Sequence, residues 1–408
     1  MSLTWTVIGG NAATWAGQVD ALYALPAMAT QPLVPAYFVK TSFARMGGSL
    51  AVLHAGSRPA PLGVGLLFPR TIVAGQPIYT LRLHALGPLP GLEELQATLE
   101  PHLAPARVVI YLPEVGRTFV ATHRSSDTFD IGAPSVAELP AIRRLRGVIW
   151  GLGDAEAYPD DLHSAEFGPA TSLVARRHGH VVGFLLGFFR FGLPALEGLP
   201  LPYRLDLLVE SQTMGVAAAY RSAGVAAALK REQARQALAR QLDVIHWTAD
   251  PLQFPNAVLN FSKLRALAGE FYPDYYPFRN ELNRITASRL GLIWLPRSAR
   301  AQAALEAAPH RERHDLSRFA GCAILNDGPN PRPYRSDAPH LALEVPADWT
   351  ALQRDDPRTA AAWRATSDML LEACLGFAPG RYLIGDTALE GGRRYLIAHR
   401  FDPALLLR

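Results

Sequence analysis

Residues 212–230 read QTMGVAAAYRSAGVAAALK. The first five residues predict a strand, and the absence of glycine and proline between Val225 and Asp250 predicts a helix that begins at Val225. The turn between them has an Arg-x-x-Gly-x-Ala pattern that starts at Arg221. Such a turn leaves consecutive backbone N–H groups unpaired at a helix N-terminus, where the donors and the helix dipole both favour a phosphate. The stretch therefore predicts an anion-binding loop, although an ordinary helix start gives the same pattern by chance.

Working outward from this loop, we find two segments that run the same way, 123 residues apart when counted from Ser49 to Ser172. Each segment contains a hairpin, a third strand, a helix and a further strand. The expected elements are Ser49–His54, Leu62–Arg70, Tyr79–Leu83, Leu92–Leu103 and Arg107–Leu112 in the first segment, and Ser172–Arg177, Val182–Arg190, Tyr203–Leu207, Val225–Leu242 and Asp243–Thr248 in the second. Hairpins rich in Gly, Leu and Phe resemble one another by chance, but the shared order of elements favours a diverged duplication.

The sequence predicts an α/β (α+β) protein with two mixed-sheet domains in tandem and a small α+β tail. Ser125–Pro134 is rich in turn residues and is interpreted as a linker, and Asn326–Pro339 is interpreted as a long loop. In the tail we expect a strand at Leu341–Pro346, a helix at Arg358–Leu375 and then a hairpin. The expected domains are residues 1–130, 135–298 and 299–408.

Composition excludes several classes of protein. The chain has 408 residues, of which 49% are hydrophobic and 19% charged, so it can bury a substantial core. A net charge of +4 on 40 basic and 36 acidic residues gives no reason to expect nucleic acid. The N-terminus lacks the pattern of a secretory signal, and the most apolar stretch, Val181–Pro202, is interrupted by charges and prolines, so we expect no membrane partner. Two isolated cysteines, Cys322 and Cys374, favour a reduced cytoplasm and no metal site.

The loop resembles motif A of the GNAT superfamily of N-acetyltransferases, whose Gln/Arg-x-x-Gly-x-Gly/Ala loop binds the pyrophosphate of acetyl-CoA. Three later stretches, residues 243–252, 256–264 and 272–276, are similar to a bacterial subgroup of predicted GNAT acetyltransferases. The resemblance is best over about residues 137–296. It implies that residues 135–298 form a GNAT domain that binds acetyl-CoA. Residues 1–130 then form a degenerate GNAT-like domain, and the tail, with Trp363 on its helix, resembles the extension that this subgroup carries.

The resemblance implies roles for individual residues. The strand would hydrogen-bond pantetheine and supply an N–H to the thioester oxyanion, and the loop would hold the pyrophosphate. Lys230 would meet the outer phosphate unless it lies on a solvated helix face. Asn256 and Asn260 would bond the cofactor or cap a helix, with capping favoured for Asn256. The expected cofactor-binding residues are Met214, Gly215, Val216, Arg221, Ser222, Ala223, Gly224, Val225, Ala226 and Asn256.

Acetylation of an amine also needs a base, because an ammonium group with a pKa of about 10 is not nucleophilic at pH 7. Glu210 lies eleven residues before Arg221, where some histone-type members carry a catalytic glutamate, and Asp206 is the backup if strand alternation places it on the same face. The family's acid tyrosine corresponds here to Phe261, which cannot donate a proton. We therefore expect Tyr272, Tyr275 or Tyr276 from the next loop, or solvent, to protonate the thiolate.

The equivalent turn of the first half, residues 85–91, contains two prolines that remove the N–H groups an anion needs, so this half should not bind CoA and its expected role is structural. His178 and His180 flank a hairpin turn without a third metal ligand. No hydrolase elbow, Walker loop or Rossmann fingerprint is present.

Three functions remain open. The first is an acetyl-CoA-dependent N-acetyltransferase with a small-molecule or peptide amine as acceptor. The second is a catalytically inactive acyl-CoA-binding or regulatory protein, which the missing tyrosine favours. The third is a purely structural protein, which requires the loop to be accidental. The sequence does not identify the acceptor or the acyl-chain length, and it leaves a homodimer open.

Overall fold

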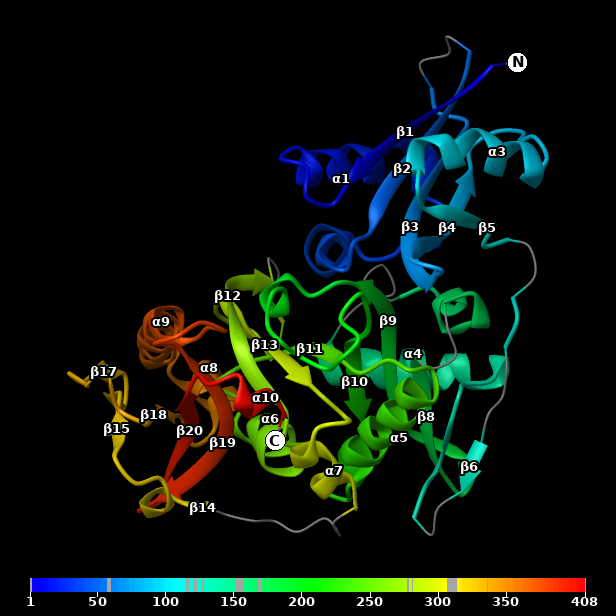
Figure 1. Ribbon diagram of the computed structural model, residues 1–408. Coiled ribbons are helices and arrows are strands. Elements are labelled where there is room, and N and C mark those ends of the chain that lie inside the picture. Colours follow the sequence, from blue (N-terminus) through cyan, green and yellow to red (C-terminus); the bar gives the residue numbers. More distant parts are fainter. Residues whose placement is uncertain are drawn as a thin grey trace. The chain divides into compact units, whose positions relative to one another are not determined.

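A computed structural model describes residues 2–56, 60–114, 117–119, 123–125, 128–151, 158–167, 171–276, 279–280, 282–306, 314–335 and 337–407. Contacts divide the chain into two compact units. Unit 1 comprises Met1–Gly192 and Asp206–Arg221, and unit 2 comprises Leu193–Leu205 and Ser222–Arg408. The elements of both units are labelled in Figure 1.

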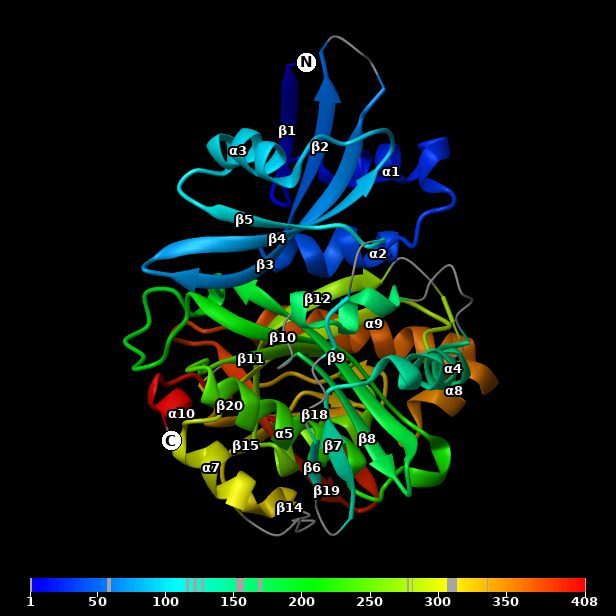
Figure 2. The same cartoon turned by 90° about the vertical axis from the view of Figure 1, so that its right-hand side faces the viewer.

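Unit 1 begins with a five-stranded sheet in the order β1-β2-β3-β4-β5, antiparallel except for the parallel pair β4–β5. Its strands are β1 (Leu3–Gly9), β2 (Ser49–Ala55), β3 (Gly63–Val73), β4 (Gln76–Ala85) and β5 (Arg107–Tyr111). Helix α3 (Leu92–Leu103) covers one face, and α1 (Trp15–Tyr23) and α2 (Ala36–Phe38) cover the other (Figure 2). Residues along β3 alternate between the two faces, so Leu67 packs on the α3 side and Phe68 on the α1 side.

The second sheet of unit 1 is an antiparallel array in the order β6-β7-β8-β9-β10. Its strands are β6 (His123–Ser125), β7 (Asp130–Gly132), β8 (Ser172–Arg177), β9 (His180–Phe191) and β10 (Leu207–Val216). Helix α4 (Leu139–Trp150) packs Ile142 against Val174 and Phe184. The segment Ser125–Pro134, interpreted as a linker, therefore contains a strand, because β7 pairs with β8. The turn-rich composition of this segment did not predict that strand.

An aromatic core joins the two sheets of unit 1. The ring centre of Phe68 on β3 lies 5.5 Å from that of Phe188 on β9, and the ring centre of Phe38 lies 5.1 Å from that of Phe188. Beside this core, Arg82 on β4 binds Asp161 through two hydrogen bonds of 2.7 and 3.0 Å, and both side chains are buried. The two sheets of unit 1 therefore pack on each other through β3 and β9.

Unit 2 contains a sheet in the order β11-β13-β12-β19-β20-β18-β15, with β14 beside β19. Its strands are β11 (Ile245–Ala249), β12 (Leu267–Tyr276), β13 (Ala287–Trp294), β14 (His314–Asp315), β15 (Cys322–Ile324), β18 (His340–Val345), β19 (Tyr382–Glu390) and β20 (Arg393–Arg400). Its helices are α5 (Val225–Ala239), α6 (Phe254–Ala257), the π-helical turn Val258–Lys263, α7 (Ala299–Glu306), α8 (Trp349–Asp355), α9 (Pro357–Cys374) and α10 (Ala404–Leu407).

The mixed α/β fold class is confirmed, and the predicted hairpins and helices are present. The strand expected at Tyr203–Leu207 is wrong, since β10 begins at Leu207. The long loop Asn326–Pro339 contains a short hairpin, β16 (Asn326–Asp327) with β17 (Asn330–Pro331). Among the described residues, no helix is both long and apolar enough to pass through a bilayer. The domain limits and the duplication stay predictions.

Candidate functional site

The loop before α5 contains two residues with positive φ. A short 3₁₀ helix, Ala218–Tyr220, follows β10, and Arg221 is extended. Ser222 then has a φ of 65°, and Gly224, the N-cap of α5, has a φ of 91°. Turns that contain left-handed residues can direct neighbouring N–H groups toward one side, where they can contact an anion. A non-glycine residue with positive φ, such as Ser222, is also typical of functional turns.

The first turn of α5 offers donors and no competing acid. The first helical hydrogen bond runs from Ala228 N–H to Gly224 O at 3.0 Å. The N–H groups of the three residues before Ala228 therefore make no hydrogen bond within the helix. Gly224 is the N-cap and has no side chain that could accept a hydrogen bond from these N–H groups, and the first turn contains no acidic residue. The residues from Arg221 to Gly224 are exposed. This helix end can therefore accept an anion from solvent.

The corresponding helix of the first half differs at the same place. Helix α3 begins at the N-cap Gly91, whose φ is −60°, and its first turn contains Glu93 and Glu94. These carboxylates already interact with the positive end of the helix dipole and would repel a phosphate. That the first half binds no CoA stays a prediction.

Strand β10, which leads into the loop, carries a bulge. Its register with β9 shifts between Ser211 and Thr213, and a bulge re-aims the residues that follow. Met214, Gly215 and Val216 lie after the bulge, at the end of the strand. A Cβ atom on Gly215 would lie 2.7 Å from Phe184, so this position has no room for a side chain.

Glu210, the expected base, is buried on β10 in unit 1. Arg190 Nη1 lies 3.2 Å from Glu210 Oε2, and each side chain is only 5% exposed. A carboxylate in such a pair already has a partner. Asp206 lies before the strand and is exposed, so the alternation expected to place it beside Glu210 does not extend to it.

Three further residues lie in unit 2 in unexpected surroundings. Lys230 is buried on α5, and its Nζ lies 3.7 Å from the centre of the Trp247 ring rather than on a solvated helix face. Asn256 is exposed within α6, whose N-cap is Gln253, so the capping role expected for Asn256 is wrong. Asn260 is buried in the π-helical turn.

Tyr272, Tyr275 and Tyr276, the candidate acids, belong to strand β12 in unit 2 rather than to a loop. The Tyr272 and Tyr275 rings are 5.6 Å apart, and Tyr275 is buried. The Tyr272 hydroxyl donates to Glu270 Oε1 at 2.8 Å. Phe261 is 1% exposed, so this helix position packs into the core and does not reach solvent.

Sequence reasoning missed the partners of these tyrosines. His246 on β11 is buried, and its Nε2 lies 3.3 Å from Glu270 Oε2 on β12. No spacing in the sequence relates these two residues, since they meet across the intervening strand β13. Successive side chains of a strand point to opposite faces, so the sequence could have predicted only that His246 and Trp247 lie on opposite faces of β11.

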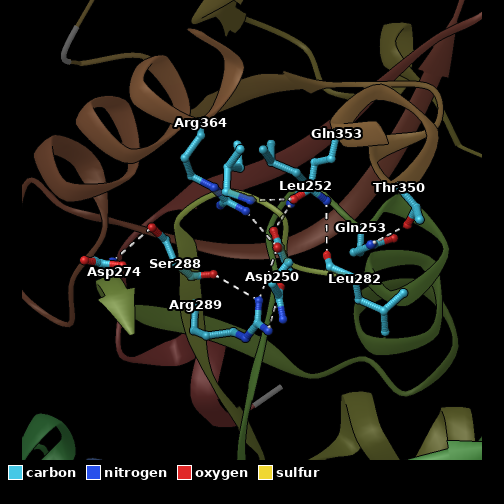
Figure 3. Close-up of polar contacts among 12 residues, drawn as sticks. Asp250, Leu252, Gln253, Asp274, Leu282, Ser288, Arg289, Thr350, Gln353 and Arg364 are labelled. Carbon is cyan, nitrogen blue, oxygen red and sulfur yellow. Dashed lines mark hydrogen bonds and ion pairs between the residues drawn. The ribbon is translucent and has the colours of Figure 1, made fainter. Parts of the chain in front are cut away.

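A second cluster in unit 2 is built around Asp250, which follows β11 (Figure 3). Arg364 on α9 donates to Asp250 Oδ2 at 2.7 Å, and Arg289 on β13 lies 3.2 Å from the same oxygen. Burial by itself would raise the pKa of Asp250, but the charges of these two arginines outweigh it and hold that pKa below its ordinary value. The cluster ties α9 of the tail to the strands that carry the candidate residues.

The cysteines and histidines of the described residues indicate no other chemistry. Cys322 and Cys374 are free thiols, and burial raises their pKa values to about 11 and about 12. His178 and His180 lie at the β8–β9 turn, as expected. Within the described part of the chain, no three His, Cys, Asp or Glu side chains are grouped as a metal site.

No protein-family model matches the chain, and no curated protein matches it. Solved structures of acetyltransferases match part of it. Ard1 from Thermoplasma volcanium is 15% identical over 41% of this chain and 97% of that protein, with a TM-score of 0.30. Arabidopsis thaliana NAA60 in complex with acetyl-CoA is 15% identical over 41% and 99%, with a TM-score of 0.33. The ribosomal-protein-S18-alanine N-acetyltransferase from Escherichia coli is 10% identical over 40% and 92%, with a TM-score of 0.29. A likeness at this level says nothing about this chain's substrates.

Proposed function

We propose that the protein is an acetyl-CoA-dependent N-acetyltransferase, in which an acceptor amine attacks the thioester directly. The observation that carries the proposal is the loop before α5, where Ser222 and Gly224 have positive φ and the first helical turn has open N–H groups without an acid. A diphosphate needs several donors close together, and the open N–H groups at the start of α5 support this assignment.

In this proposal each group of the expected site has one task. Residues Arg221 to Ala226 hold the diphosphate, with the exposed Arg221 as the cation. Met214, Gly215 and Val216 offer backbone groups to pantetheine and to the thioester oxygen. Glu210 as base, Tyr272 and Tyr275 as acids, and Asn256 as a cofactor contact remain predictions.

Two protons leave the nitrogen during the reaction. The base takes one from the ammonium ion, and the neutral amine attacks the thioester carbonyl carbon. The new C–N bond forms as the C–S bond breaks, and the second proton ends on the thiolate, either from a tyrosine hydroxyl or through solvent. The products are the amide, free CoA and one proton released to solvent.

The acceptor is a small-molecule or peptide amine in this proposal, and the protein acts in the cytoplasm. The two segments expected to select the acceptor are Leu193–Leu201, which includes a 3₁₀ turn at Pro194–Leu196, and Asp154–Pro169, part of which lies outside the described residues. The sequence of these segments does not identify the class of acceptor. The domain limits 1–130, 135–298 and 299–408 belong to the same proposal.

One observation favours the alternative of an acyl-CoA-binding protein without turnover. Phe261 stands where the resemblance expects an acid tyrosine, and it is packed in the core. Calorimetry with acetyl-CoA, followed by thiol release with a panel of amines, separates the two functions. Binding without thiol release would support the inactive protein.

Arg221→Glu is the direct test of the loop. Because it replaces a cation with an anion beside the diphosphate, we expect acetyl-CoA affinity to fall by at least tenfold. Arg358→Glu makes the same charge change at an exposed position on α9 and should leave the affinity unchanged. Equal affinities for the two variants would remove the loop assignment.

A further inference from the structure

Two histidines face each other across the β18–β20 pair of unit 2. His340, the first residue of β18, lies directly opposite His399 on β20. Their Nδ1 atoms are 3.0 Å apart, within hydrogen-bond distance. A ring nitrogen either donates through its N–H or accepts through its lone pair, so this contact requires a hydrogen on one Nδ1 atom and none on the other.

Asp386 on β19 decides which of the two rings donates. Its Oδ2 lies 2.9 Å from His399 Nε2, and an ionised carboxylate can only accept, so this nitrogen carries a hydrogen. Burial by itself would raise the pKa of this carboxyl group, but the hydrogen bond from the imidazole and the charges of Arg300 and Arg265 hold that pKa below its ordinary value. The carboxylate therefore stays ionised at neutral pH. A neutral His399 has no second hydrogen, so its Nδ1 accepts and the Nδ1 of His340 donates.

The pair can take up one proton without losing this contact. The proton adds to Nε2 of His340, and the charged ring still donates through its Nδ1. If both rings become imidazolium ions, each Nδ1 atom carries a hydrogen, and two like charges face each other across 3.0 Å. Burial and the charge of His399 lower the pKa of His340, and Asp386 offsets this only in part. Protonation of both rings therefore breaks the contact between them.

The groups around the pair either act in the same direction or keep their charge in mild acid. The charged and titratable groups that the described part of the chain places there are Asp386 on β19, Arg265 before β12, Arg300 on α7, His314 on β14, Arg318 in the 3₁₀ turn after β14 and Cys322 on β15. Burial raises the pKa of Cys322 to about 11, so this thiol stays neutral. Arg318 Nη1 lies 2.7 Å from His314 Nδ1, and an arginine can only donate, so protonation of His314 would break this contact as well.

The segment Leu316–Ile324 lies against the two rings. The ring centre of Phe319 is 5.7 Å from that of His340 and 6.0 Å from that of His399. Cys322 is the first residue of β15 and lies opposite His340, and among the described strands β15 pairs with β18 alone, at the end of the sheet. Phe319 and Cys322 are only partly buried. The position of this segment therefore depends on where the two rings lie.

We propose that the His340–His399 pair is a pH-sensitive switch, in which protonation of both imidazoles releases the segment Leu316–Ile324 from the edge of the sheet. At neutral pH the shared hydrogen keeps the rings together, and Phe319 packs on both. In acid the rings separate, and β15 loses its neighbour at the start of β18. The switch lies within unit 2 and does not depend on the proposed acetyltransferase function.

Hydrogen exchange measured by mass spectrometry tests the switch at about pH 7.5 and about pH 5, with labelling times scaled for the chemical exchange rate at each pH. In the wild-type protein we expect the peptide that contains Leu316–Ile324 to lose protection by about tenfold or more at the lower pH. The peptide that contains β13 is the internal control, because release of the segment leaves that strand protected. Equal protection of the wild-type segment at both pH values, or a loss that β13 shares, would contradict the proposal.

His340→Asn tests whether the pair causes the change. The amide does not titrate, and it can turn either its N–H or its oxygen toward His399, so most of the pH dependence of the segment should disappear. His178→Asn removes an exposed histidine at a φ of 51°, which asparagine tolerates, and should behave as the wild-type protein does. A loss of protection in His340→Asn equal to that of the wild-type protein would show that the pair is not the switch.

The wild-type protein alone keeps the proposal testable if His340→Asn does not fold. ¹⁵N NMR of the imidazole nitrogens at neutral pH distinguishes the Nδ1–H from the Nε2–H tautomer. We expect His340 to carry its hydrogen on Nδ1 and His399 to carry its hydrogen on Nε2. A hydrogen on Nε2 of both rings would leave none between the Nδ1 atoms and would overturn the proposal.

Discussion

Gly224→Ala tests the loop through its backbone. Gly224 has a φ of 91° and a Cβ there would meet no atom within 4 Å, so the cost of alanine comes from the backbone conformation alone. For a residue with a Cβ, the left-handed conformation costs about 1–2 kcal/mol. If the free loop relaxes to avoid that strain, the binding of acetyl-CoA must restore the left-handed conformation of residue 224. The affinity for acetyl-CoA should then fall by a factor of about 5–30.

Gly91→Ala is the matched control. Gly91 is also an N-cap glycine without a side-chain cap and with open space at its Cβ position, but its φ is −60°. Changes in N-cap preference and in unfolded-chain entropy are therefore similar for the two variants and cancel in their difference. If the loop keeps its conformation instead, we expect Gly224→Ala to be less stable than Gly91→Ala by about 1–2 kcal/mol, and the losses of stability and of binding free energy should together amount to that left-handed cost.

Urea unfolding, followed by tryptophan fluorescence, gives the stability difference, and calorimetry gives the affinities. Gly91→Ala should bind acetyl-CoA as the wild-type protein does. The reasoning is refuted if the two variants unfold at the same urea concentration and Gly224→Ala also binds acetyl-CoA with unchanged affinity.

Two further predictions concern unit 1. Arg82→Met leaves the buried Asp161 carboxylate without its guanidinium, so we expect a loss of about 3–5 kcal/mol in urea unfolding, and a smaller loss when Asp161→Leu is added; a loss below about 1 kcal/mol for the single variant would contradict this. Burial lowers the pKa of His163 to about 4, so the unfolded chain takes up a proton that the folded protein refuses. Stability should therefore fall between about pH 6.5 and pH 4 by up to about 1.4 kcal/mol per pH unit, and His163→Asn should flatten that decline; an unchanged slope would count against it.

Local elements were predictable because each depends on short-range sequence. Helix α3 spans Leu92–Leu103 as predicted, and the hairpins β2–β3 and β8–β9 follow from two apolar runs around a turn. Predictions failed where pairing overrides composition. Strand β7 forms in a turn-rich segment because β8 offers it hydrogen-bond partners, and Tyr203–Leu205 stays irregular despite its β-rich residues.

The candidate site divides in the same way. The loop from Arg221 to Ala226, which we propose binds the diphosphate, could be located in sequence because such a turn is made by consecutive residues. The Glu270 carboxylate between His246 and Tyr272 could not, because it depends on a register in which Gly291 lies between two other strands.

The sequence by itself determined the fold class and the order of most elements, and it located the loop that we propose binds an anion, because backbone preferences and apolar periodicity act over a few residues. Only the tertiary structure decided which charges are paired. Glu210 is tied to Arg190, Lys230 lies on Trp247, and Asp250 binds Arg364 from a helix 114 residues further along the chain. Burial and partner decide what a charged group can do, and both depend on strand register and packing between residues that are far apart in the chain.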